Sequence, residues 1–322
     1  MKTFSSPFLW LILIVVGGVS LLPIVTDSPA LREDLFLMLM LVTLASSVNI
    51  IMGYTGYVSF GHIVYFGLGG YVAFYLMQNS GVHVVVAALI GGGVASLIAF
   101  LIGIPVLRLR GAYFALATIG INEAFRVLVT NLPFLGGSIG MLFNFSAYDP
   151  YGGGKSAQQL AYFAMVITAL LTIATSFIIK KSKFGLGLMA IREDQDAAMV
   201  LGINPVRTKA VTYAISAFFP ALAGTFFFFK NGTILPETAF ELYRSIEALV
   251  MVMLGGYGTV TGPIVGAVVY ERLRGFLITN PTLSQAHLVI AGGLLLLIVL
   301  FVTAGVVGWL RNRFPAVRRY LE

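Results

Sequence analysis

The chain has 322 residues, of which 58% are hydrophobic and 10% are charged, and its formal net charge is +7. A soluble domain typically carries about 25% charged residues, so this composition excludes a soluble globular fold and points to the lipid bilayer as solvent. Cys is absent, which excludes disulfides and thiolate metal sites, and the 3 His residues form no ligand motif. We therefore expect an all-α polytopic transmembrane bundle without a metal or a cofactor.

A helix that spans a bilayer needs about 20 mainly apolar residues, and the chain offers about ten such runs. They cover 8–25, 35–52, 62–78, 84–107, 111–130, 159–180, 209–230, 244–256, 262–278 and 287–309. The first run is interpreted as a retained span, because no small-x-small cleavage site precedes Asp27 and more spans follow. The runs 244–256 and 262–278 are short, so a count of eight or nine spans and a re-entrant segment remain open.

Basic residues predict the orientation, because cytoplasmic loops of membrane proteins are enriched in Lys and Arg. They gather at Arg108 and Arg110, in the loop 181–208 and in the tail 311–322. These segments are predicted to be cytoplasmic, and the loops 26–34, 131–158 and 231–243 to face outward. Ten spans then place both termini in the cytoplasm. Arg272 and Arg274 conflict with this topology, since they fall near the outer end of a span. Basic residues flanked by apolar runs also exclude nucleic acid as the partner.

The chain is predicted to be one membrane domain, 1–322, with two similar Gly-rich breaks between apolar helices. Gly in a membrane helix permits unwinding or close helix approach, and freed backbone groups must be satisfied inside the protein or in a water-filled cavity. Such breaks often lie along a transport pathway. Translocation and simple helix packing both remain open. The candidate pathway residues are Tyr54, Gly56, Ser59, Phe60, Gly61, His62, Gly255, Gly256, Gly258 and Thr259.

The loop 181–208 is predicted to form one short helix over 187–201, ended by Gly202 and with Pro205 beyond it. Its charged side chains are those of Arg192, Glu193, Asp194 and Asp196. A short helix that mixes apolar and charged residues can dock into a partner's groove or lie as an ordinary interfacial helix. Both interpretations remain open.

Charges inside predicted spans mark the next candidates. Glu123 and Arg126 are three residues apart, share a helix face and are predicted to form an intramembrane ion pair of structural role. Arg244 and Glu247 have the same spacing. The segment 149–156 ends like a phosphate-binding loop, but Asp149 replaces the required first glycine, so nucleotide binding by this chain is excluded.

Four stretches together resemble the permease subunits of bacterial branched-chain amino acid importers of the ATP-binding cassette class, the LivM/LivH type. They are GYTGYVSFGHIVYFGLGGY from Gly53, RGAYFALATIGINEAFR from Arg110, SKFGLGLMAIREDQDAAMVLGINPVRT from Ser182 and LGGYGTVTGPIVG from Leu254. Permeases of such importers carry a Glu-Ala-Ala-x-x-x-Gly core in a cytoplasmic loop. Asp196, Ala197, Ala198 and Gly202 match that core, with Asp in place of Glu.

The resemblance implies a multi-pass permease of the bacterial inner membrane that performs no chemistry itself. Its partners would be two ATP-binding cassette subunits docked on the loop 181–208, a second permease in a heterodimer, a periplasmic substrate-binding protein and membrane lipid. The cassette-coupling residues that the resemblance implies are Arg192, Glu193, Asp194, Asp196, Ala197, Ala198 and Gly202. The substrates implied are Leu, Ile and Val, and a pathway for them would combine apolar residues with a few polar groups, for which Tyr54, Ser59 and Phe60 are candidates. A permease for urea or short amides, and a secondary transporter working alone, remain alternatives.

Overall fold

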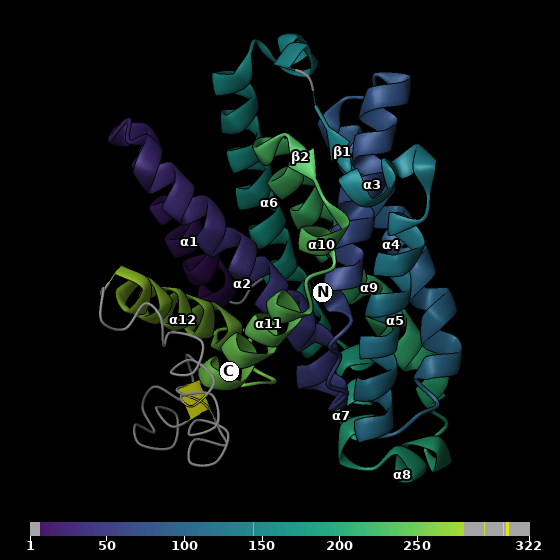
Figure 1. Cartoon of the computed structure of the whole chain (residues 1–322). Helices are drawn as coiled ribbons and strands as arrows, with labels where there is room; N and C mark the ends of the chain where they lie inside the picture. The colour runs from purple at the N-terminus through teal and green to yellow at the C-terminus, as the bar shows by residue number, and fades with distance from the viewer. Residues whose placement is uncertain (1–6, 144, 280–292, 294–304, 306, 309–322) are drawn as a thin grey trace.

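The computed structural model describes residues 7–143, 145–279, 293, 305, 307 and 308. It is a bundle of helices with one very short antiparallel strand pair (Figure 1). The long helices are α1 Pro7–Val25, α2 Pro29–Thr55, α3 His62–Ser80, α4 Val84–Val106, α5 Ala112–Thr130, α6 Gly154–Lys181, α9 Pro205–Asn231, α11 Leu242–Gly255 and α12 Gly262–Thr279. The shorter elements are η2 Pro133–Leu135, η3 Gly137–Ile139, β1 Met141–Leu142, η4 Phe145–Tyr151, α7 Lys183–Glu193, α8 Gln195–Val200, β2 Thr233–Ile234 and α10 Pro236–Ala239.

These helices confirm the predicted polytopic all-α membrane fold. Within the described ranges, α2, α4, α5, α6 and α9 are long and apolar enough to cross a bilayer. The helices α1, α3, α11 and α12 coincide with four further predicted runs. The predicted span 287–309 and the tail 311–322 lie outside the described residues, apart from 293, 305, 307 and 308.

The predicted break between the runs 244–256 and 262–278 separates two helices, α11 and α12. The 14 residues of α11 give a helix of about 21 Å, shorter than the hydrocarbon core of about 30 Å. The Gly-rich turn therefore follows a helix that is too short to cross the bilayer alone.

The centre of the bundle is formed by α2 and α9. Of an apolar 18-residue segment in each helix, 89% is buried in α2 and 22% in α5. A helix that is hydrophobic all round belongs either in a protein core or against lipid, and α2 is packed inside the bundle by α6, α9, α11 and α12. The mostly uncovered helix α5 lies on the outside of the bundle.

Small residues allow α3, α4 and α9 to pack closely against one another. A Cβ at Gly224 of α9 would overlap the carbonyl oxygen of Phe66, and one at Gly69 of α3 would overlap that of Ala221. A Cβ at Gly91 of α4 would lie 3.0 Å from the carbonyl oxygen of the same Gly69. Backbone-to-backbone contact of this kind is the usual way in which helices associate in lipid, where no hydrophobic force drives them together.

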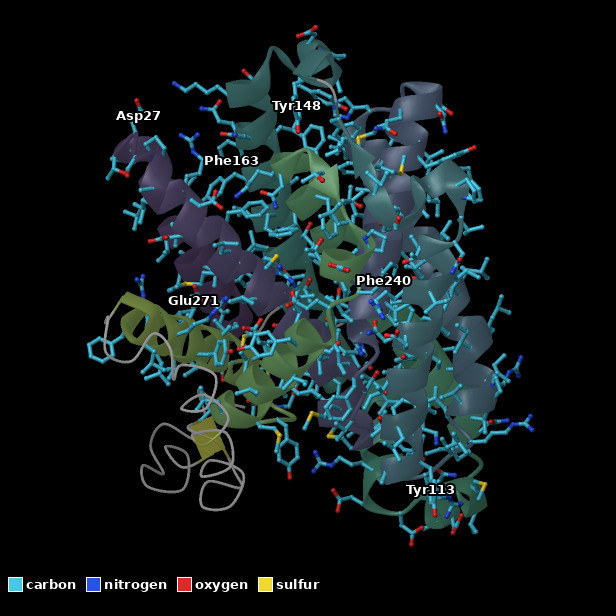
Figure 2. All side chains as sticks on the ribbon, viewed as in Figure 1. Asp27, Tyr113, Tyr148, Phe163, Phe240 and Glu271 are labelled. Atoms are coloured by element: carbon cyan, nitrogen blue, oxygen red, sulfur yellow. The ribbon has the colours of Figure 1, made fainter. Side chains whose placement is uncertain are left out.

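The loop 131–158 folds into short turns at the end of the bundle opposite α7 and α8 (Figure 1). Met141 of β1 pairs with Ile234 of β2, and the Tyr148 hydroxyl donates to the carbonyl of Phe229 at 2.7 Å. Tyr148 marks this end in Figure 2, and Tyr113, at the start of α5, marks the other. The loop is thereby tied to the end of α9.

Candidate functional site

Two short helices, α7 and α8, form the end of the bundle that Tyr113 marks (Figures 1 and 2). The Ser182 hydroxyl caps α7 by accepting from the amide of Gly185 at 3.0 Å. Gly185 lies against the carbonyl of Ile179, so a side chain at this corner would separate α7 from α6. α7 buries Leu188 and Ile191 against the bundle and leaves its charged last turn at the surface.

The prediction of a single helix over 187–201 is wrong, because the chain breaks at Asp194 into α7 and α8. The Asp194 carboxylate accepts from the amides of Asp196 at 2.8 Å and Ala197 at 3.0 Å, which makes it the N-cap of α8. Asp side chains compete with helix continuation by bonding nearby amides. Because Asp194 caps α8, α7 ends at the residue before it, Glu193. Gly202 does end α8, with a left-handed φ of 84°.

The cap predicts a pH dependence of α8. The two backbone hydrogen bonds hold the pKa of the Asp194 carboxyl below its usual range. A carboxyl with a depressed folded pKa stabilises the fold above its unfolded pKa, and that contribution is lost as the pH falls through the folded pKa. We expect the amides of Asp196 and Ala197 to lose protection in that acidic window, measured by hydrogen exchange corrected for its intrinsic pH dependence. Asp194→Asn, which caps without titrating, should abolish this pH dependence. If the variant and the parent showed the same dependence of amide exchange on pH, the cap would be contradicted.

The surface of α8 combines charge with apolar side chains. Asp196 forms an ion pair of 2.9 Å with Arg110, which precedes α5, and both side chains are exposed. Ala198 is buried, Ala197 is exposed, and the exposed apolar residues that follow are Met199, Val200 and Leu201. These three residues form, with Asp196 and Ala197, the α8 surface.

The two Gly-rich breaks, distant in sequence, lie against each other. Asn49 of α2 joins them: its amide nitrogen donates to the carbonyl of Thr259 at 2.8 Å, and its oxygen accepts from the amide of Gly258 at 2.9 Å. A Cβ at Gly53 would lie 2.6 Å from the amide nitrogen of Gly258. The end of α2 therefore touches the α11–α12 turn through its backbone.

The structure places most of the predicted pathway residues inside helix contacts. The Tyr54 hydroxyl bonds the hydroxyl of Ser176 at 2.8 Å, Ser59 bonds Tyr213 at 3.4 Å, and His62 bonds Ser216 at 3.1 Å. Tyr54, Ser59, Gly61, His62, Gly255, Gly256 and Thr259 are buried, Phe60 and Gly258 are half-buried, and Gly56 is exposed. In this conformation the hydroxyls and the imidazole hold helices together.

A buried cation that the sequence analysis missed lies beside the first break. Lys209 of α9 is fully buried and donates to the Tyr57 hydroxyl at 2.7 Å, the Leu107 carbonyl at 2.8 Å and the Gln195 side-chain oxygen at 3.0 Å. Tyr57 belongs to the break and Gln195 begins α8. The one signal in the sequence is a lysine at the start of an apolar span, where a buried role and an interfacial role look alike.

The outer face of α5 carries the predicted pair of charges. The Arg126 guanidinium donates to the Glu123 carboxylate, with Nε to Oε2 at 3.0 Å. The side chains are 40% and 54% exposed, so within this subunit the pair faces outward. Charges at membrane depth are costly in contact with lipid, so this face of α5 calls for protein or water against it.

The expected pairing of Arg244 with Glu247 is wrong. Arg244 instead pairs with Glu241 at 3.3 Å, one turn earlier, and its guanidinium lies over the Phe227 ring. Glu247 turns toward α12, where it accepts from the Tyr270 hydroxyl at 2.9 Å and lies 3.8 Å from Arg274. The three-residue spacing fitted both partners of Arg244, and the packing of α11 against α12 decided between them. This contact also gives Arg274 a partner within the bundle.

Among the described residues, no group of three or more His, Asp or Glu side chains is arranged to hold a metal ion. The side chains brought together at the breaks are neutral donors and acceptors, Lys209, and Arg192 of α7. Such an arrangement can orient helices and transmit their movement.

Known proteins resemble most of the chain. Residues 33–310 match the family model of the permease component of branched-chain amino acid transport systems. The high-affinity branched-chain amino acid transport system permease protein LivM of Escherichia coli is 30% identical over 287 residues, and LivM of Salmonella typhimurium is 29% identical over 287 residues. Each match covers 81% of this chain and 66% of the relative.

LivH, a second permease protein of that transport system in Escherichia coli, is 30% identical over 149 residues, which are 44% of this chain and 46% of LivH. No solved structure matches the chain significantly. The family match runs from Glu33 in α2 through α12, and it includes both breaks and the α7–α8 segment. The chain belongs to the family of permease components of branched-chain amino acid transport systems.

Proposed function

We propose that this chain is the membrane-spanning permease subunit of an ATP-binding cassette importer that moves Leu, Ile and Val across the bacterial inner membrane. The observation that carries the proposal is the α8 surface: a capped short helix outside the spans, with exposed Val200 and Leu201 and a charged residue, Asp196. An exposed apolar and charged helix of this kind fits a groove in a partner. Membership of the permease family supplies the transport context.

The proposed partners are two cassette subunits on the α7–α8 end, a second permease in a heterodimer, and a periplasmic substrate-binding protein at the opposite end. In this arrangement α7, α8 and both termini are cytoplasmic. ATP hydrolysis belongs to the cassettes, and this chain is not the enzyme. Closure of the cassettes would move α7 and α8 and switch the pathway between outward and inward access, by hinge or rocking motion.

The second permease is proposed to cover the outer face of α5. Tyr113 and Leu116 are exposed there, along with the Glu123–Arg126 pair. Two subunits that meet at this face would enclose the ion pair and remove it from lipid. The pathway would then run near α5 and the first break, where Phe60 is half-buried and its amide donates to the Thr118 hydroxyl at 3.0 Å.

Co-purification from the native membrane tests this proposal. We expect a tagged chain, extracted gently, to bring along cassette subunits and a second permease. The purified complex in liposomes should take up Leu with ATP, and excess Ile or Val should compete whereas urea and acetamide should not. Uptake without ATP by the chain alone would contradict the importer and identify a secondary transporter. Competition by urea or acetamide would support the importer class but contradict Leu, Ile and Val as its substrates.

A further inference from the structure

The side chain of Arg192, in the last turn of α7, lies between the two Gly-rich breaks. Its Nη1 donates to the carbonyl of Gly53 at 2.9 Å, and its guanidinium carbon is 5.7 Å from the centre of the Tyr257 ring. A Cβ at Gly56 would lie 3.1 Å from its Cγ, and one at Gly258 would lie 3.1 Å from its Nη1. The aliphatic stem thus covers the first break and the charged head reaches the second.

The end of α2 has a backbone group that suits this cation. The amide of Gly56 bonds back to the carbonyl of Met52 at 2.9 Å, and Gly56 then takes a left-handed φ of 77°. The carbonyls after Met52 are among those that a helix leaves without an intrahelical partner at its C-terminus. A guanidinium at that end satisfies one of them, the Gly53 carbonyl, and complements the negative end of the helix dipole.

The α11–α12 turn provides space and a favourable contact for the Arg192 guanidinium, through Gly258 and Tyr257. Gly258 has a φ of 75°, so a side chain there would be strained as well as crowded by the guanidinium. Asn49 also holds this turn to α2, through Gly258 and Thr259. Tyr257 offers a ring face to the cation, a favourable contact at a partly exposed site.

A second connection reaches only the first break. Tyr57 donates to the Gln195 side chain at 3.2 Å, and Lys209 donates to both of them. Between these contacts and Arg192 lies a cavity of about 350 Å³, lined among others by Gly56, Arg110 and Ile191. Arg192, in contrast, is placed against both breaks.

We propose that Arg192 is the positioning residue that makes both breaks, and the α11–α12 turn in particular, follow the movement of α7. The inference rests on the proposed function, in which cassettes drive α7. It assigns Arg192 to the transmission of movement inside the permease rather than to the docking of a cassette. Because guanidinium and turn meet directly, loss of the side chain should release the turn while α7 and the α8 surface keep their structure.

Hydrogen exchange tests the contact independently of transport. In Arg192→Ala, we expect the amides of the turn 256–261 to exchange about tenfold faster, as local opening becomes easier, and those of α8 to be unchanged. Arg207→Ala, which removes an exposed arginine at the start of α9, is the matched control and should leave the turn unchanged. Equal exchange in parent and Arg192→Ala would overturn the proposal.

The coupling ratio, substrate moved per ATP hydrolysed, tests the consequence in the complete complex. We expect Arg192→Ala to lower it about tenfold, the order of a typical coupling between two sites, with cassette recovery and ATP hydrolysis near those of the parent. Arg192→Lys, which keeps one cationic donor, should restore part of the ratio. Loss of cassette recovery, or an unchanged ratio, would overturn the role. A parent complex that takes up no substrate with ATP would instead overturn the proposed function, whatever hydrogen exchange shows of the contact.

Discussion

Replacement of Gly224 by alanine is expected to destabilise the bundle strongly, although it adds only one methyl group. The new Cβ would overlap the backbone carbonyl of Phe66, which cannot rotate away as a side chain can. Overpacking of this kind typically costs about 1–3 kcal/mol and outweighs the gain in helix propensity of about 1 kcal/mol from Gly to Ala. We expect a lower yield of monodisperse protein and a melting temperature lower by several degrees.

The matched control is Gly93→Ala in α4. It makes the same chemical change in a neighbouring helix, where a Cβ would meet nothing within 4 Å. This variant should be as stable as the parent or slightly more stable, because Ala is the better helix former. Equal melting temperatures for the two variants would contradict the close packing of α3 against α9.

Long apolar runs predicted the position of the helices well. The run 84–107 became α4 Val84–Val106, and the short runs at 244–256 and 262–278 became α11 and α12. Such predictions succeed because a segment that spans the bilayer must be continuously apolar and must satisfy its own backbone hydrogen bonds. Consecutive residues of the sequence are enough to show this. The Gly-rich breaks were predicted for the same reason, since Gly interrupts a run visibly.

Local competition between similar structures was harder to predict. The segment 187–201 has the composition of one helix, yet the side chain of Asp194 supplies a cap that divides it. Arg244 has acidic residues three positions away on both sides, and only the packing of α11 against α12 selects Glu241. In both cases the sequence spacing permits two outcomes, and a local cap in the first case and tertiary contacts in the second decide between them.

The contacts that join the site were beyond sequence analysis. Arg192 reaches Gly53, 139 residues away, and Lys209 reaches Tyr57, 152 residues away. Gly53 belongs to the first Gly-rich stretch and Arg192 to the loop 181–208, but no spacing in the sequence indicates that the two are in contact. Lys209 has the sequence context of an interfacial lysine, and only the fold buries it. A single sequence identifies residues with unusual chemistry in a membrane, but their pairing follows from the packing of helices.

If the chain works in an importer as proposed, Asp196→Lys combined with Gly202→Pro is expected to reduce transport with ATP by a factor of about ten or more while the protein stays inserted. The lysine would face Arg110, now within 2.9 Å of Asp196, and replace attraction by repulsion at the start of α8. Proline holds φ near −65°, whereas Gly202 has a φ of 84° and its amide donates to the carbonyl of Met199 at 3.0 Å. Both ends of α8 would be disturbed, and the α8 surface with them.

Asp196→Glu combined with Gly202→Asn is the matched control. Glu keeps the charge that pairs with Arg110, and Asn tolerates the left-handed conformation at a helix end better than other side chains do. Transport in this variant should stay near that of the parent. If α8 docks a cassette, the disturbing pair of changes should lower cassette recovery or stimulation of ATP hydrolysis by substrate, whereas Arg192→Ala should lower only the coupling ratio. Full transport in the disturbed variant would show that the movement of the cassettes enters the permease elsewhere, because transport would then not require either end of α8 to be intact.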